Sequence, residues 1–143
     1  MSTTGLPVFD ETLHLTNIWL KDLGDLLDSD DRSLAYRALR ETLHILRDRL
    51  PVNVAAALAA QLPLLLRGAY YEGWRPAATP TNVRHTGEFV AQIRQAFRDT
   101  PANEPERIVR AVFSLLSARV SPGEIENVKK CLPEELRHLW ASV

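Results

Sequence analysis

The chain of 143 residues matches itself when it is shifted by 70 positions, and this internal repeat constrains its fold more than any other feature. Residues 18–70 align without a gap on residues 88–140. The identities gather in L-x-x-R at 46–49 and L-P-x-x-L-R at 62–67, which both recur 70 residues later. A repeat of this kind indicates a duplicated unit that cannot bury its apolar face alone. We therefore expect two pseudo-symmetric units that share one core.

The first unit begins with the periodicity of an amphipathic helix. The apolar face between residues 13 and 27 is formed by Leu13, Trp19, Leu20, Leu23, Leu26 and Leu27. The segment Asp28-Ser29-Asp30 offers N-cap candidates for a second helix. That helix should end near Leu50, because a residue that precedes a proline, here Pro51, disfavours the α region.

Prolines and caps mark the start of the later helices. An alanine-rich helix is predicted from Val52 to Leu62, followed by a short helix from Pro63 to about Tyr70. The corresponding signals of the second unit are Thr86, Pro105, Ser121 with Pro122 and Glu124, and Pro133. Pro63 and Pro133 are expected as the first helical residues of their helices. No stretch alternates with period two, so the prediction is an all-α fold.

The repeat also sets the predicted domain organisation. Each unit, at about 53 residues, is too small to bury its apolar faces well on its own. We expect one helical bundle-like domain over residues 1–143, with repeat one at about 12–70 and repeat two at about 86–143. The linker at about 71–85 contains Gly73, Pro76 and Pro80, and is predicted to be a strap over the bundle.

Composition and charge narrow the class of protein. A net charge of −1 and a pI of about 6.4 argue against an obligate polyanion binder. Cys131 is the single cysteine, so an intramolecular disulfide is excluded. The N-terminal residues lack the basic and apolar regions of a secretory signal, and the most apolar stretch is too short to span a bilayer. We expect a cytoplasmic protein without a membrane segment.

Fourteen of the 17 basic residues are arginines, and eight of these form pairs that are 70 residues apart. The pairs are Arg37/Arg107, Arg40/Arg110, Arg49/Arg119 and Arg67/Arg137. Arg49 and Arg119 fall inside the apolar arc of their helices and therefore need partners. No acidic residue has an acidic counterpart 70 positions away, so backbone carbonyls at a helix C-terminus are the predicted partners of both arginines. We interpret the repeated arginines and prolines as structural, and an anion-binding role is the alternative.

A second group of basic residues lies on the opposite, polar face of the same helix. Arg37, Arg40 and Arg47, together with His44, form a basic strip that could bind an anion or a nucleic acid. The alternative is a solvated face with local ion pairs such as Arg37–Glu41. The slight negative charge of the chain and the lack of aromatic residues in the strip favour the solvated face.

A metal site is a further hypothesis, because three Glu-x-x-His pairs occur in the chain. They are Glu11–His14, Glu41–His44 and Glu135–His138. Di-iron bundles use such pairs only when they all point into the bundle, whereas these pairs fall on polar faces and at non-equivalent places of the two units. Nucleotide-binding loops, nucleophile elbows and C-x-x-C motifs are absent from the sequence. No cofactor, metal site or catalytic residue is therefore predicted.

The aromatic residues around the start of the linker are dense for a chain that has only ten. Tyr70 has an aromatic counterpart in Trp140 and is predicted to lie in the core. Tyr71 and Trp74 have no counterparts. They either pack the strap over the bundle or form an exposed anchor for a partner protein.

The stretches 38–50 and 59–76 resemble the bacterial family known as domain of unknown function 2267, through the pattern L-P-x-x-L-R-G-x-Y-Y-x-G-W at 62–74. The resemblance extends from about Thr12 to the C-terminus. It implies an all-helical, bacterial and cytoplasmic protein and brings no catalytic residues. The favoured hypothesis is a non-enzymatic interaction or regulatory module that binds a protein partner or itself. An anion or nucleic-acid binder that uses the Arg37/Arg40/Arg47 face is the first alternative, and a metalloprotein is the second.

Overall fold

A computed structural model describes residues 2–99 and 104–140, and every regular element in these ranges is helical. The prediction of an all-α fold is confirmed. The first half contains α1 (Pro7–Leu26), α2 (Arg32–Arg49), α3 (Val52–Ala59) and α4 (Leu64–Tyr71). A short 3-10 turn, η1 (Pro76–Ala78), follows in the linker. The second half contains α5 (Thr86–Ala96), α6 (Pro105–Arg119), α7 (Pro122–Lys130), α8 (Glu134–Arg137) and the 3-10 turn η2 (His138–Trp140).

Four helix boundaries of the first half coincide with boundaries of the second half under the 70-residue shift. α1 and α5 end at Leu26 and Ala96, and α2 and α6 end at Arg49 and Arg119. The starts of α3 and α7, and those of α4 and α8, are also 70 residues apart. The residue after α2 and the residue after α6 both have extended backbone angles. Matched boundaries are what a duplication would leave, and the duplication itself stays a prediction.

The caps agree with the sequence in part. Ser121 caps α7 by accepting a hydrogen bond from the Glu124 backbone N–H. α2 is capped by Asp31, whose side chain accepts from the Leu34 N–H, and not by any residue of 28–30 as predicted. Pro63 and Pro133 also lie one position earlier than expected. Both are extended N-cap residues, with ψ near 150°, and the helix starts at the residue that follows.

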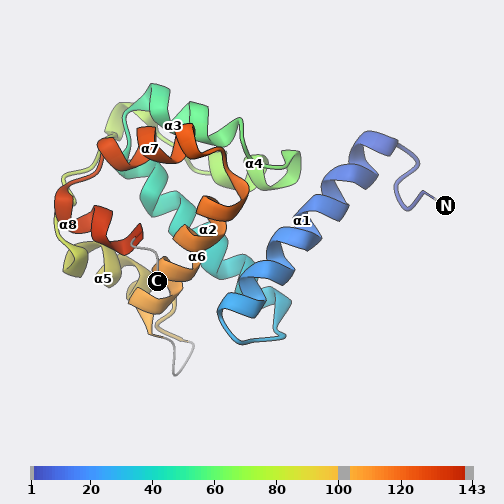
Figure 1. Ribbon diagram of the computed structural model, residues 1–143, viewed down its shortest axis with the longest axis horizontal. Coiled ribbons are helices and arrows are strands. Elements are labelled where there is room, and N and C mark those ends of the chain that lie inside the picture. The colour runs from blue at the N-terminus through green and yellow to red at the C-terminus, as the bar shows by residue number, and fades with distance from the viewer. Residues whose placement is uncertain (1, 100–103, 141–143) are drawn as a thin grey trace.

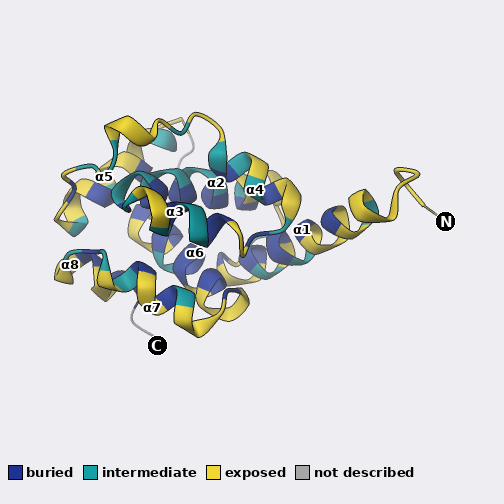
Figure 2. Ribbon diagram, turned by 90° about the horizontal axis from the view of Figure 1, so that it is seen from above, coloured by how far each residue is buried: buried dark blue, intermediate teal, exposed yellow. Residues whose placement is uncertain are grey.

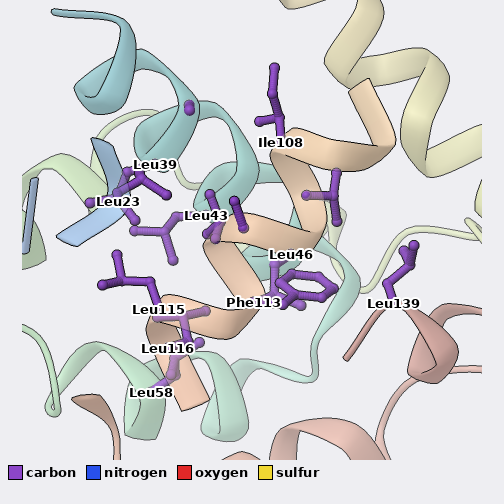
Figure 3. Close-up of a cluster of buried hydrophobic side chains, with 14 of the residues drawn as sticks. Leu23, Leu39, Leu43, Leu46, Leu58, Ile108, Phe113, Leu115, Leu116 and Leu139 are labelled. Atoms are coloured by element: carbon purple, nitrogen blue, oxygen red, sulfur yellow. The ribbon is translucent and has the colours of Figure 1, made fainter. Parts of the chain in front are cut away.

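α2 and α6 pack against each other in the middle of the molecule, with α1 and α5 beside them (Figure 1). Leu39, Leu43 and Leu46 of α2 face residues of α6 such as Phe113 and Leu116 (Figure 3). The buried apolar side chains of both halves form a single cluster. Burial of a leucine side chain contributes roughly 1.5–3 kcal/mol, so the contact between α2 and α6 is a major source of stability.

α1 does not pack against the rest of the molecule over its whole length. Its first turns extend away from the other helices in both views (Figures 1 and 2). Leu13 and Leu26, which the sequence placed on the core face, are 36% and 44% exposed, so this part of the prediction is wrong. The tip of the helix is nevertheless structured, because the Asp10 carboxylate accepts hydrogen bonds from the Ser2 hydroxyl and from Thr4. Among the described helices, α1 included, no segment has the length and hydropathy that a membrane span requires.

The linker runs back over α2. The Thr81 backbone N–H donates to the Asp48 carbonyl at 2.8 Å, and Val83 is buried in the core. The peptide bond between Thr79 and Pro80 is cis. Residues 71–85 are thus fixed to the bundle at two points, as expected of a strap.

Candidate partner-binding groove

A groove with a volume of about 750 Å³ lies between α1, α2 and α4. α1 supplies one wall, α4 supplies the other from Leu65 to Tyr71, and Tyr36 of α2 also lines the groove. The lining is mostly apolar. It consists of Leu13, Thr16, Asn17, Leu20, Tyr36, Leu65, Leu66, Gly68, Ala69, Tyr71 and Glu72. A concave, mainly apolar site of this volume is typical of binding sites in proteins.

α1 fixes the start of α4 at one end of the groove. The N-cap of α4 is Pro63, which has no side-chain donor or acceptor, so the first N–H groups of the helix need another partner. The buried Thr12 of α1 supplies it, because its hydroxyl accepts from the Leu65 N–H at 2.9 Å. Gly68 leaves space in the same wall, since a Cβ atom placed there would meet no atom within 4 Å.

Three basic side chains of α2 fix the end of α4. Arg47 Nη1 donates to the carbonyls of Tyr70 at 2.7 Å and Glu72 at 2.9 Å. His44 Nε2 donates to the carbonyl of Ala69 at 2.7 Å. Arg40 binds the Glu72 carboxylate at 2.6 Å. The last carbonyls of a helix lack intrahelical donors and carry partial negative charge, so cations are favoured there. We call Arg40, His44 and Arg47 the α4 clamp.

The basic strip is therefore not a solvated face. Arg47, predicted on the polar surface of its helix, is buried, with 3% of the residue exposed. The prediction failed because a helical wheel of α2 does not show that α4 covers its polar side. Arg37 faces a different neighbour: its Nη2 donates to the Ala96 carbonyl at 2.7 Å, and its guanidinium lies 4.7 Å from the centre of the Phe97 ring. All three arginines of the strip bind groups of the chain itself.

The clamp also sets the electrostatics at the end of the groove. The hydrogen bond from Arg40 lowers the pKa of the Glu72 carboxyl. Burial lowers the pKa of the His44 imidazole, so its neutral form is favoured against α4. Of these two groups, Glu72 lines the groove, where its carboxylate is paired with Arg40.

Tyr71 and Trp74 are half-buried and stack on each other, with ring centres 5.2 Å apart. Tyr71 lines the groove, whereas Trp74 lies behind it, against the core. The indole N–H of Trp74 is buried and has no hydrogen-bond partner among the described residues. Trp74 therefore packs the strap over the bundle, and Tyr71 lines the groove; the role of an anchor for a partner stays a prediction.

The repeated arginines reach different partners in the two halves. Arg49 Nε donates to the Val83 carbonyl at 2.6 Å, which is a backbone partner as predicted but lies in the linker and not at a helix C-terminus. Arg119 binds the Asp22 carboxylate of α1, so the prediction of a carbonyl partner is wrong for this residue. Arg67 donates to carbonyls at the end of α3, including Ala59 at 3.0 Å, and Arg137 is exposed. The inference from the shift failed because the two arginines do not have equivalent surroundings.

The three Glu-x-x-His pairs remain separate. Glu41 binds Arg40, His44 binds α4, and Glu135 accepts from the Thr86 N–H and the His85 ring. Within residues 2–99 and 104–140, no group of three or more His, Cys, Asp or Glu side chains could hold a metal ion. The described part of the chain therefore offers no ligand set for the metalloprotein alternative.

Most residues that line the groove could not be identified as candidates from the sequence. Leu65, Thr16 and Tyr36 were not candidates, and Leu13 was assigned to the core. The exposed residues Leu64 and Leu65, 47% and 48% accessible, come directly after Pro63. Two leucines at the start of a short helix were a usable signal, because one face of an eight-residue helix cannot bury Leu64, Leu65 and Leu66 together.

Comparison with protein families gives one match. Residues 16–139 fit the model of the family described as uncharacterized conserved protein (DUF2267). The chain belongs to this family. The matched range of DUF2267 includes the clamp, α4 and most of the groove, and it starts at Thr16 of α1. The search of curated proteins gives no match.

Proposed function

We propose that this DUF2267 protein is a non-enzymatic interaction module that binds an amphipathic helix of a polypeptide in the groove between α1, α2 and α4. The groove has the length of about two helical turns on α1, from Leu13 to Leu20. Helix-in-groove recognition uses apolar side chains spaced three and four residues apart, which match walls that are themselves helices.

The observation that carries this proposal is an accessible apolar surface built on fixed helices. Tyr36, Leu13 and Leu65 are 38%, 36% and 48% exposed and lie around one groove. Contiguous apolar surface that is rimmed by polar groups is a mark of interaction sites. Both ends of α4 are held by hydrogen bonds from other helices, so the wall is in place before a partner arrives.

The chemistry of the lining favours binding over catalysis. Glu72 is the titratable carboxylate of the lining, and it is already paired with Arg40. The remaining polar groups of the lining are hydroxyls and an amide, without a neighbouring base. Nucleic-acid binding by the basic strip is disfavoured, because Arg40 and Arg47 are occupied in holding α4.

The test is a titration of the isotope-labelled protein with a synthetic 18-residue helix that carries leucines at 3–4 spacing. Amide resonances of the residues that line the groove should shift, and those of α7 should not. Leu65→Asp should abolish the shifts, whereas Leu64→Asp should retain them. The two leucines are neighbours with almost equal exposure, and only Leu65 lines the groove. Shifts that are spread over all faces, or the same loss in both variants, would contradict the proposal.

A further inference from the structure

α1 has an apolar seam that continues beyond the domain. Its residues are spaced three and four positions apart, as in a coiled coil: Leu6, Phe9, Leu13, Thr16, Leu20, Leu23 and Leu27. Leu23 and Leu27 are buried in the core, and Leu20 and Thr16 are buried at the floor of the groove. Leu6, Phe9 and Leu13 are 50%, 45% and 36% exposed.

The exposed part of this seam is an ordered helix without a cover. The hydrogen bonds of Asp10 with Ser2 and Thr4 fold the preceding residues onto the first turn. No other helix lies over the first turns in either view (Figures 1 and 2). The part of α1 that fits the family starts at Thr16, so the exposed turns add an apolar surface to the matched region.

We propose that the groove binds α1 of a second copy of this chain, in an antiparallel pair with two-fold symmetry. The proposal rests on the proposed function and names the partner. A two-fold interface must be complementary to itself, and the seam and the groove meet this condition because Leu13 belongs to both. With the axis near Leu13, Phe9 of each copy reaches the groove of the other beside Thr16.

Charge complementarity supports the antiparallel direction. Asp10 and Asn17 are seven residues apart and lie on the same flank of the seam. Arg32 Nη1 donates to the Asn17 side-chain oxygen at 2.6 Å, and no carboxylate within the described ranges forms an ion pair with Arg32. An antiparallel pair brings the Asp10 carboxylate of one copy to Asn17 and Arg32 of the other. A parallel pair would not bring these groups together, because residues on the same flank of the two helices then lie on opposite sides of the interface.

Thr16 gives a second reason to expect an occupant. Its hydroxyl oxygen is buried in the groove wall and has no hydrogen-bond partner among the described residues. Such a group costs free energy unless a partner supplies a donor or an acceptor. In the antiparallel pair, the polar flank of the second α1 passes beside Thr16.

The experiment is the molar mass of the full chain by sedimentation equilibrium, from about 1 to about 200 µM. The chain should approach twice its mass of 16.1 kDa as the concentration rises. Phe9→Asp should weaken the dimer by about thirtyfold or more, because Phe9 is the aromatic side chain that each copy would insert into the groove of the other. Val8→Asp is the matched control. Val8 is exposed on the same turn but lies off the seam, so the dimer should persist.

A charge exchange tests the direction of the pair. Arg32→Asp should weaken the dimer, and combination with Asp10→Arg should restore it, with circular dichroism to verify that each variant is folded. A chain that stays monomeric at about 200 µM would overturn the proposal, as would equal effects of Phe9→Asp and Val8→Asp. Binding of the synthetic helix by a monomeric chain would show that the groove is an interaction site for another protein. A monomer that also fails to bind the helix would contradict both proposals.

Discussion

The two halves of the molecule share helix boundaries and differ in what holds their last helices. In residues 18–70, the polar side chains of the clamp hold an eight-residue α4. In residues 88–140, positions 114 and 117 are serines, and α8 has only four residues before a 3-10 turn. Trp140 stacks there on Phe113, with ring centres 4.1 Å apart. The clamp thus accompanies the longer helix, and that helix forms the wall of the groove.

The two halves have the same order of helices, but the side chains at equivalent positions make different contacts. Tyr70 donates its hydroxyl to the Ala55 carbonyl at 2.8 Å, whereas its counterpart Trp140 has a buried N–H without a partner in the described residues. Of the clamp, the second half retains Arg110, which donates to the His138 carbonyl at 3.1 Å. The positions of several helix ends are the same in both halves. The groove depends on side chains that are present only in the first half.

The largest expected effect concerns the core that the halves share. Leu46 and Leu116 occupy equivalent positions in the two halves, and both side chains are fully buried. The test variants are Leu46→Ala and Leu116→Ala. Each should lower the free energy of unfolding by about 2–5 kcal/mol, through lost burial and a cavity. Denaturant unfolding should remain a single transition in both variants. If one variant splits the transition in two, the halves fold separately and the shared core is refuted.

The second effect concerns the clamp. Arg47→Ala should cost about 3 kcal/mol, since it leaves the carbonyls of Tyr70 and Glu72 buried without their charged donor. Ser117→Ala at the equivalent position should change the stability by less than about 0.5 kcal/mol, because Ser117 is exposed. Chemical denaturation measures both. Equal losses would mean that the clamp has no special role.

The paired arginines at the ends of α2 and α6 offer a finer contrast. Arg49→Met should lower the stability by about 1–2 kcal/mol, because the half-buried guanidinium donates to the Val83 carbonyl and holds the strap. Arg119→Met removes an exposed ion pair with Asp22 and should cost about 0–1 kcal/mol. Thermal unfolding of the two variants gives the order. An unchanged stability in Arg49→Met would contradict its structural role.

The smallest effect is a pH dependence confined to the first half. Burial lowers the pKa of His44 below its ordinary value of 6.5, so between these two values the unfolded chain binds more protons than the folded chain. Stability should therefore fall as the pH falls below about 6.5. His44→Gln keeps a donor for α4 and should flatten this part of the curve. Ser114→Gln, at the equivalent exposed position, should leave the curve as it is in the unmodified chain.

The helices could be predicted from the sequence, but the contacts between the helices could not. Pro51, Pro63, Ser121 and Pro133 act on the adjacent backbone, so their effects could be placed to within a residue or two. The burial of Arg47 depends on α4, which covers the polar side of α2, and a helical wheel contains no information on that contact. The exposure of Leu13 depends on where α1 leaves the body, which its uninterrupted seam does not reveal.

The central claim is that the exposed seam of α1 is an interface, and that α5, its counterpart, has no such role. Hydrogen exchange at two protein concentrations, about 1 and about 200 µM, tests it most directly. Amides of residues 8–16 should become better protected at the higher concentration, while those of α5 should not change. Equal protection of residues 8–16 at both concentrations would show that the exposed seam is not an interface.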